Sequence, residues 1–278
     1  MGLFNRGPVV PVLRLSGAIG MAAPLRPGLS LAALAGPIEK AFSMSKAKSV
    51  AVVINSPGGS PVQSSLLFQR MRQLADEKGK KIYVFCEDVA ASGGYYLAVA
   101  GDEIYADASS IIGSIGVISA SFGLDQAIAK LGISRRVYTA GTHKGALDPF
   151  QPENPDDVAR LKAIQRNVHD VFIGVVKDRR VGRLKGPDGE VFSGAFWSAT
   201  DALELGLIDG ISDVRTKMRA LHGENVRLRV VPVEKGWLAS RFRKLPSVSG
   251  DGGAVRLAFA DDLVSAVEIR ALWSRFGL

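Results

Sequence analysis

Residues 48–61 read KSVAVVINSPGGSP, an apolar and β-branched run that ends in one proline and two glycines. Apolar residues at consecutive positions indicate a strand buried on both faces, as in a parallel sheet. Pro57, Gly58 and Gly59 then mark a turn, and Pro61 stands where the first turn of a helix accepts proline. This stretch therefore predicts a central strand, a turn and a helix.

The same alternation of strand and helix signals extends from residue 9 to about residue 140. Further strands are predicted for PVVPVLRLSG (8–17), KKIYVFCE (80–87), DEIYAD (102–107), GVIS (116–119) and SRRVYTAG (134–141). Helices are predicted for residues 29–47, 63–79, 92–101 and 124–132. The pattern is typical of an α/β fold with a parallel sheet flanked by helices.

The second half of the chain predicts fewer strands. A long helix is expected over residues 153–180, with Asn154 and Pro155 as its cap and first turn. A small strand, helix and strand group follows within residues 187–214: GEVFSG (189–194), WSATDALELG (197–206) and LIDGIS (207–212). We expect a main domain over residues 1–221 and a basic extension over 222–278. That extension contains a predicted strand (226–235), a flexible stretch (247–254) and a terminal amphipathic helix (261–277).

The chain is basic, with 35 Lys and Arg against 27 Asp and Glu and a formal net charge of +8. Such a charge suits an anionic partner, either a membrane surface or a nucleic acid. The basic runs RVGRLK (180–185), VRLRV (226–230) and RFRK (241–244) all follow residue 179. Because no nucleic-acid-binding motif accompanies them, we expect no nucleic-acid partner.

The cysteine content and the hydropathy pattern indicate the cellular compartment in which the protein is expected. The one cysteine, Cys86, excludes an internal disulfide and fits a reducing compartment, and its apolar neighbours predict a core residue. The N-terminal residues lack the apolar run of a signal peptide, and no later window suits a transmembrane helix. We therefore expect a cytoplasmic protein, or one attached peripherally to the inner membrane.

Residues 88–96 read DVAASGGYY and place Ser92 between a predicted strand and a predicted helix. The first N–H groups of a helix have no intrahelical acceptor, so they can stabilise the oxyanion formed when a serine there attacks a carbonyl. Gly93 and Gly94 leave room for substrate backbone. A serine that only caps the helix fits the same residues, and this stretch alone does not decide between cap and nucleophile.

A nucleophilic serine needs a base. His169 and His222 are predicted at the surface, and the histidines do not follow the order of a Ser-His-Asp triad. Lys144, in TAGTHKGALDPF (139–150), follows a predicted strand among small and apolar residues. Burial lowers the pKa of a lysine and lets it accept a proton from serine. A solvated surface amine is the alternative for any single lysine.

The ordered motifs of the chain resemble those of the signal peptide peptidase A family, which includes the SohB-type peptidases. They are INSPGGSP (54–61), AASGGYYLAVAGDEIYADASSIIGSIGV (90–117), YTAGTHKGALDPFQPENPDD (138–157) and FSGAFWSATDALELGLID (192–209). The resemblance runs from residue 9 to residue 214 and implies a ClpP/crotonase-like fold with a Ser-Lys dyad. It implies these roles: Ser92 as nucleophile, Lys144 as general base, Ser114 orienting the lysine, and the N–H groups of Gly58 (or, less favoured, Gly59) and Gly93 as the oxyanion hole.

The resemblance also implies a serine endopeptidase without metal or other cofactor. Its substrates would be apolar peptides such as cleaved signal peptides, and its active sites would line a homo-oligomeric ring or bowl. Two departures stand out: the N-terminal membrane anchor of many members is not seen, and the final 60 or so residues match no family motif.

Two alternatives stay open at this stage. A crotonase-type hydratase or thioesterase shares the fold and an oxyanion hole, but needs a pocket for coenzyme A. A noncatalytic scaffold at a membrane surface would use the aromatic and basic residues of GWLASRFRK (236–244).

Overall fold

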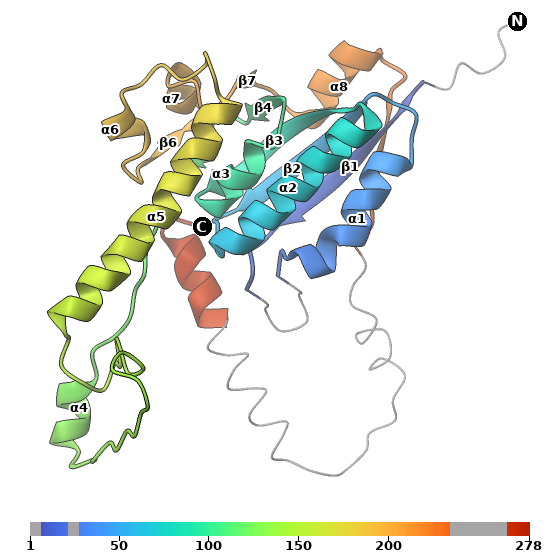
Figure 1. Cartoon of the computed structure of the whole chain (residues 1–278). Helices are drawn as coiled ribbons and strands as arrows, with labels where there is room; N and C mark the ends of the chain where they lie inside the picture. The colour runs from blue at the N-terminus through green and yellow to red at the C-terminus, as the bar shows by residue number, and fades with distance from the viewer. Residues whose placement is uncertain (1–6, 22–27, 234–265) are drawn as a thin grey trace, which may run out of the picture.

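The computed structural model describes residues 7–21, 28–233 and 266–278, which form a sheet with helices on its faces (Figure 1). The strands of the described part are β1 (Val9–Ser16), β2 (Ser49–Ser56), β3 (Lys81–Ala91), β4 (Glu103–Ala106), β5 (Ile111–Gly113), β6 (Phe196–Ser198), β7 (Gly210–Ile211) and β8 (Arg227–Val230). Its helices are α1 (Leu31–Ser43), α2 (Pro61–Lys78), α3 (Gly93–Ala98), α4 (Asp125–Lys130), α5 (Pro155–Arg179), α6 (Asp188–Val191), α7 (Ala199–Glu204) and α8 (Val214–His222).

The sheet has the strand order β6-β5-β3-β2-β1-β8, with β4 beside β3 and β7 beside β4. Every pair is parallel except β5 with β6. The predicted class, an α/β fold with a mainly parallel sheet flanked by helices, is confirmed.

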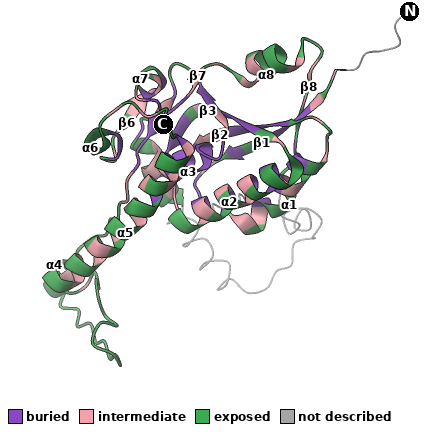
Figure 2. Ribbon diagram, turned by 45° about the horizontal axis from the view of Figure 1, so that its top comes forward, coloured by how far each residue is buried: buried purple, intermediate pink, exposed green. Residues whose placement is uncertain are grey.

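The central strand β2 is buried on both faces, as its continuous apolar run predicts. Every residue of β2 except Asn55 is buried (Figure 2). Val50 and Val52 join the large apolar cluster under α1, α2 and α3. Ala51 and Val53 face the opposite way, into a smaller cluster that α8 covers with Met218. Burial on two faces fixes the depth of β2 and of the loop that follows it.

The helices begin and end at the capping and stop residues that the sequence predicts. In α2, Pro61 occupies the first turn, and Gly79 ends the helix in the left-handed region with φ 58°. In α5, the side chain of Asn154 accepts a hydrogen bond from the N–H of Asp156, and Pro155 opens the helix. These local signals set where each helix starts.

The long strand β3 changes partners along its length. Residues 83–86 pair with β4, whereas residues 89–91 pair with β5. The register between β2 and β3 shifts between Ile54 and Ser56. As a result, the ends of β2, β3 and β5 lie side by side, and the residues that follow all three strands meet at one edge of the sheet.

Three predicted strands are wrong. Residues 116–119 and 134–141 are not strands, and residues 188–191 form the short helix α6 where a strand was expected from 189. Residues 116–153, which include α4, form an arm that projects from the body (Figures 1 and 2). None of these residues is buried. A strand needs a neighbour for its backbone groups, and the described part of the chain gives residues 116–119 and 134–141 none.

The C-terminal region returns to the body. β8 pairs with β1 in parallel, and residues 266–274 are helical, as predicted for that part. Most of the tail proposed to touch a membrane, residues 236–244 included, lies outside the described residues. Within the described ranges, no helix has both the length and the apolar character needed to cross a bilayer.

Phe276 anchors the C-terminal helix beneath the ends of β3 and β5. It is buried among Val89, Ala91 and Ile111 and stacks edge-on against Phe196, with ring centroids 5.2 Å apart. We expect Phe276→Ala to lower the free energy of unfolding by about 3 kcal/mol, because it leaves a cavity over these strands.

Urea unfolding measures this loss. Val267→Ala, on the helix that precedes Phe276 but 62% exposed, is the control and should change the free energy by less than about 0.5 kcal/mol. Equal stability of Phe276→Ala and the unsubstituted protein would mean that the helix contributes nothing to the fold.

Candidate active site

Ser92 connects β3 to α3 in a conformation that few residues other than glycine adopt. Its φ and ψ are 53° and −122°, and its side chain makes no capping hydrogen bond to α3. The backbone is held from both sides: the N–H of Ser92 donates to the carbonyl of Gly113 at 2.8 Å, and its own carbonyl accepts from Tyr96 at 3.0 Å. A strained serine whose hydroxyl is not used as a cap favours a functional role over the capping role.

The loop after β2 lies directly against Ser92. Gly58 has φ 103°, and a Cβ added there would stand 2.8 Å from the Cβ of Ser92 and 2.9 Å from the nitrogen of Gly93. The N–H of Gly58 donates to Ser56 Oγ over a long 3.3 Å. Gly93 is the first residue of α3, so its N–H has no acceptor within the helix. The structure therefore brings Gly58 and Gly93 beside Ser92, as the predicted oxyanion hole requires.

Gly59 occupies the next position of the same loop, with φ 140°. Its backbone packs on Ile19, whose carbonyl oxygen would lie 2.1 Å from an added Cβ. The loop is locked there by two hydrogen bonds, from the N–H of Ile19 to Gly58 and from the N–H of Ser60 to Ile19, each 2.8 Å.

Gly58 allows a test of this close approach. We expect Gly58→Ala to lower the free energy of unfolding by about 1–3 kcal/mol and to reduce any activity that depends on Ser92, because the methyl group forces the loop away from Gly93. Gly36→Ala is the control, since Gly36 lies in α1 with open space around its Cα. Chemical denaturation checks the result; unchanged stability of Gly58→Ala would contradict the packing described above.

Ser114 follows β5 in the same way that Ser92 follows β3. Ala91 and Gly113 are paired residues, so Ser92 and Ser114 occupy matching positions after neighbouring parallel strands. Ser114 also has a positive φ, 51°, and is buried. Its N–H donates to the carbonyl of Ala195 at 2.7 Å, and its hydroxyl makes no hydrogen bond within the described residues.

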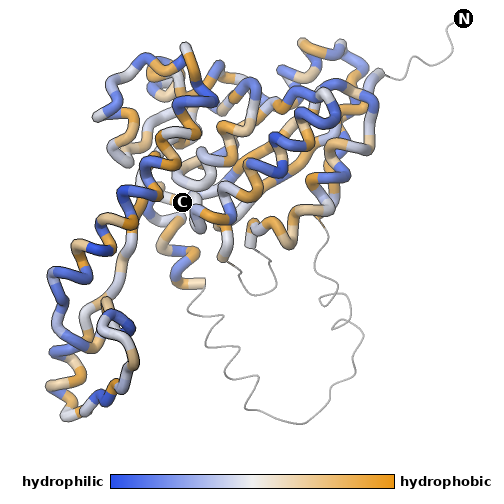
Figure 3. The backbone as a smooth tube through the Cα atoms, viewed as in Figure 1, coloured by the Kyte–Doolittle hydropathy of each residue, from blue (hydrophilic) through white to orange (hydrophobic). Residues whose placement is uncertain are grey.

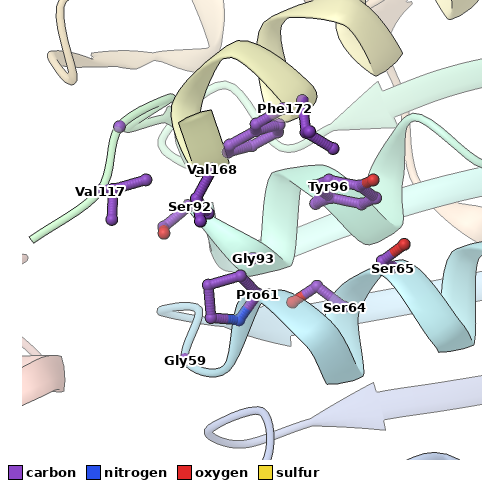
Figure 4. Close-up of a pocket in the computed structure, with 12 residues that line it drawn as sticks. Gly59, Pro61, Ser64, Ser65, Ser92, Gly93, Tyr96, Val117, Val168 and Phe172 are labelled. Atoms are coloured by element: carbon purple, nitrogen blue, oxygen red, sulfur yellow. The ribbon is translucent and has the colours of Figure 1, made fainter. Parts of the chain in front are cut away.

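A small pocket of about 60 Å³ opens beside Ser92 (Figure 4). Its walls come from the loop after β2, the start of α2, α3, the segment after β5 and the middle of α5. Apolar side chains dominate the lining: Pro61, Tyr96, Val117, Val168, Val171 and Phe172. Sequence reasoning missed the α5 residues, although Val168 and Phe172 share a helix face by their spacing of four. The pocket is smaller than a cofactor site and suits one apolar side chain.

Lys144 lies on the arm, in a turn where its N–H donates to the carbonyl of Gly141 at 3.2 Å. Its side chain is exposed and makes no hydrogen bond to Ser92 or Ser114 within the described residues. The burial expected from its neighbours in the sequence is therefore absent in the single chain, where none of residues 116–153 is buried. The structure brings Ser92, Ser114, Gly58 and Gly93 together, but not Lys144.

The histidines have other partners. His143, on the exposed arm, contacts Arg160 of α5. His222 contacts Ser49 Oγ at 3.0 Å, and burial lowers the pKa of this histidine. His169 and His222 both differ from the prediction of surface residues, since each is half-buried. His169 places its Nε2 2.9 Å from the carbonyl oxygen of Ile115. Its spacing from Phe172 and Val176, three and seven residues, is the sequence signal that places it on the buried face.

Cys86 is confirmed as a core residue. It is buried inside β3, and burial raises the pKa of its thiol to about 12. A thiol in this state is not a nucleophile near neutral pH.

The family model described as peptidase family S49 matches residues 75–226, which contain Ser92, Ser114 and Lys144. The curated relatives carry mixed names. A Brucella abortus protein named Na(+)/H(+) antiporter NhaA is 52% identical over 275 residues, covering 97% of this chain and 37% of that protein. The chloroplastic serine protease SPPA of Arabidopsis thaliana is 29% identical over 267 residues, covering 92% of this chain and 38% of that protein. The chain thus spans well under half of the length of both relatives.

Among solved structures, a membrane-bound stomatin-specific protease matches with a TM-score of 0.50 and 16% sequence identity, over 81% of this chain and 98% of that one. This likeness concerns the fold, and it agrees with the predicted ClpP/crotonase-like architecture.

Proposed function

Because the chain belongs to peptidase family S49, whose family model matches residues 75–226, we propose that it is a serine peptidase with Ser92 as its nucleophile. The observation that carries the proposal is the turn at Ser92: a positive φ, a hydroxyl that does not cap α3, and two glycine amides alongside. In the first step, Ser92 Oγ attacks the scissile carbonyl, and the amides of Gly58 and Gly93 stabilise the resulting oxyanion.

A base must take the proton of Ser92, and we assign this role to Lys144. In its neutral form, the amine accepts the hydroxyl proton and then protonates the leaving amine of the substrate. Water next attacks the acyl-enzyme, with the same amine as base. Ser114 matches Ser92 in register, and its hydroxyl, which has no hydrogen-bond partner in the described part of the chain, is suited to hold the lysine amine.

Lys144 reaches such a site from a neighbouring copy of the chain. No residue of the arm that carries it, residues 116–153, is buried, yet the arm contains hydrophobic positions, which colour parts of its backbone orange in Figure 3. Its large apolar side chains that are exposed are Ile118, Phe122, Leu124, Leu131, Ile133, Val137, Tyr138 and Leu147. Apolar surface of this extent favours an interface. A homo-oligomer, such as a ring or bowl, would cover the arm and desolvate Lys144, which favours its neutral form.

Extended apolar peptides, cleaved signal peptides included, are the substrates that this site suits best. The pocket beside Ser92 accepts one apolar side chain next to the scissile bond, and the glycines around Ser92 leave space for peptide backbone. Side-chain pockets beside an extended backbone give specificity in peptide recognition.

Covalent labelling tests the assignment of the nucleophile. We expect an alkyl fluorophosphonate to label the protein on Ser92, detected by mass spectrometry of the modified peptide, and Ser92→Ala to lose the label. Ser109→Ala, which removes an exposed serine of the turn after β4, is the control and should be labelled normally. Undiminished labelling of Ser92→Ala would remove the peptidase proposal and favour a crotonase-type enzyme or a noncatalytic scaffold.

A further inference from the structure

The side chain of His169 joins two walls of the pocket beside Ser92. One wall is the segment after Ser114, with Gly116 and Val117, and the other is α5, with Val168 and Phe172 (Figure 4). His169 lies on α5 between these wall residues, and its Nε2 is 2.9 Å from the carbonyl oxygen of Ile115. The walls therefore contact each other through a directed hydrogen bond.

This bond adds a directed restraint to the segment after β5, where the side chain of Ile115 is already buried in the large apolar cluster. The sheet ladder ends at Gly113, and the N–H of Ser114 makes the last backbone bond, to Ala195. In the described part of the chain, no hydrogen bond other than that of His169 reaches the backbone of residues 115–120. Val117 stands at the start of the arm of residues 116–153, none of which is buried, so the arm holds no buried side chain that would fix its position.

The geometry defines the chemistry of the contact. A carbonyl oxygen accepts hydrogen bonds, so the ring must carry a proton on Nε2. Ile115 is fully buried and the histidine is half-buried, so removal of the ring N–H leaves a carbonyl oxygen of a buried residue without its donor. Loss of the donor would free the wall to shift away from α5.

We propose that His169 is a positioning and specificity-determining residue, which sets the width of the apolar pocket by tying residues 115–117 to α5. This role of His169 rests on the proposed function, in which the pocket selects the substrate residue next to the scissile bond. His169 does not touch the reacting atoms; it acts through Ile115 and Val117.

Two substitutions separate the hydrogen bond from the bulk of the ring. His169→Leu keeps apolar volume but removes the donor, whereas His169→Gln places an amide N–H near the position of Nε2. Asn167→Leu is the matched control, because Asn167 is exposed on the same helix. If His169→Leu fails to fold, His169→Asn takes its place. The asparagine side chain is about one bond too short for its amide N–H to reach the carbonyl oxygen of Ile115, so this variant also lacks the hydrogen bond.

The first measurement is a selectivity ratio. Peptides that differ only in the residue before the cleaved bond, alanine, valine, leucine or phenylalanine, are compared by kcat/KM. The selectivity ratio is kcat/KM for the best peptide divided by kcat/KM for the peptide with the bulkiest residue. We expect His169→Leu to reduce this ratio at least fivefold, mainly through KM, while His169→Gln and Asn167→Leu keep it within twofold. An unchanged ratio in an active His169→Leu protein, or a His169→Gln protein that behaves like it, overturns the proposal.

The second measurement does not depend on activity. Hydrogen exchange of the backbone N–H of Ser114, which donates to the carbonyl of Ala195 directly before the tied segment, should be at least tenfold faster in His169→Leu than in His169→Gln, with unchanged exchange in β2. Equal exchange in the two variants overturns the proposal even where no peptide is cleaved. Tenfold faster exchange without any peptide cleavage supports the tie between the walls, while the proposed function itself fails.

Discussion

Replacement of Ser92 by alanine is expected to lower kcat/KM for peptide hydrolysis by about 10³-fold or more, because no other group then attacks the scissile carbonyl. The oxyanion donors beside it, the amides of Gly58 and Gly93, stay in place. The residual rate should therefore reflect these donors and substrate binding alone. Hydrolysis of an apolar fluorogenic peptide measures the effect.

The same position offers a control for misfolding. Ser92→Gly removes the nucleophile as completely as Ser92→Ala, but glycine tolerates φ 53° without strain. We expect the glycine variant to be inactive and about 1 kcal/mol more stable than the alanine variant. Ser109→Ala should keep full activity. Retention of more than about a tenth of the rate by either Ser92 variant would contradict a nucleophilic role.

The sequence predicts those features of the fold and site that have local signals. The continuous apolar run of β2 predicts a strand buried on both faces, and Pro61, Gly79 and Asn154 mark helix ends where the structure has them. The glycines of the loop after β2 and the serine after β3 are expected near each other, because adjacent parallel strands end at the same edge of a sheet.

Features that depend on distant contacts could not be predicted in this way. Residues 134–141 have strand-like composition, but a strand forms only where a neighbour accepts its hydrogen bonds. The pairing of β8 with β1 joins segments more than 200 residues apart. The contact of His169 with Ile115 joins two segments 54 residues apart, so it emerges only from the packing of α5 beside the segment after β5.

The position of Lys144 also depends on contacts that the local sequence does not reveal. Its replacement is the second substitution expected to have a large effect on activity. We expect Lys144→Ala to lower kcat/KM by about 10³-fold, since it removes the base that activates Ser92. Lys130→Ala is the control, because Lys130 is an exposed lysine on α4 of the same arm. Peptide hydrolysis by Lys144→Ala at the rate of Lys130→Ala would mean that another group, or water, takes the proton.

A mixture of the two inactive variants distinguishes a dyad within one chain from a dyad shared between copies. Oligomers assembled from Ser92→Ala and Lys144→Ala chains contain contacts in which an intact Ser92 meets an intact Lys144 only if the two residues come from different copies. Random assembly in equal amounts makes about a quarter of such contacts complete, so we expect about a quarter of the original activity to return. Native mass spectrometry confirms that both chains are present in each oligomer. If mixed oligomers stay inactive, Lys144 must act on Ser92 of its own chain, and the arm would have to fold back over the pocket rather than extend toward a neighbour.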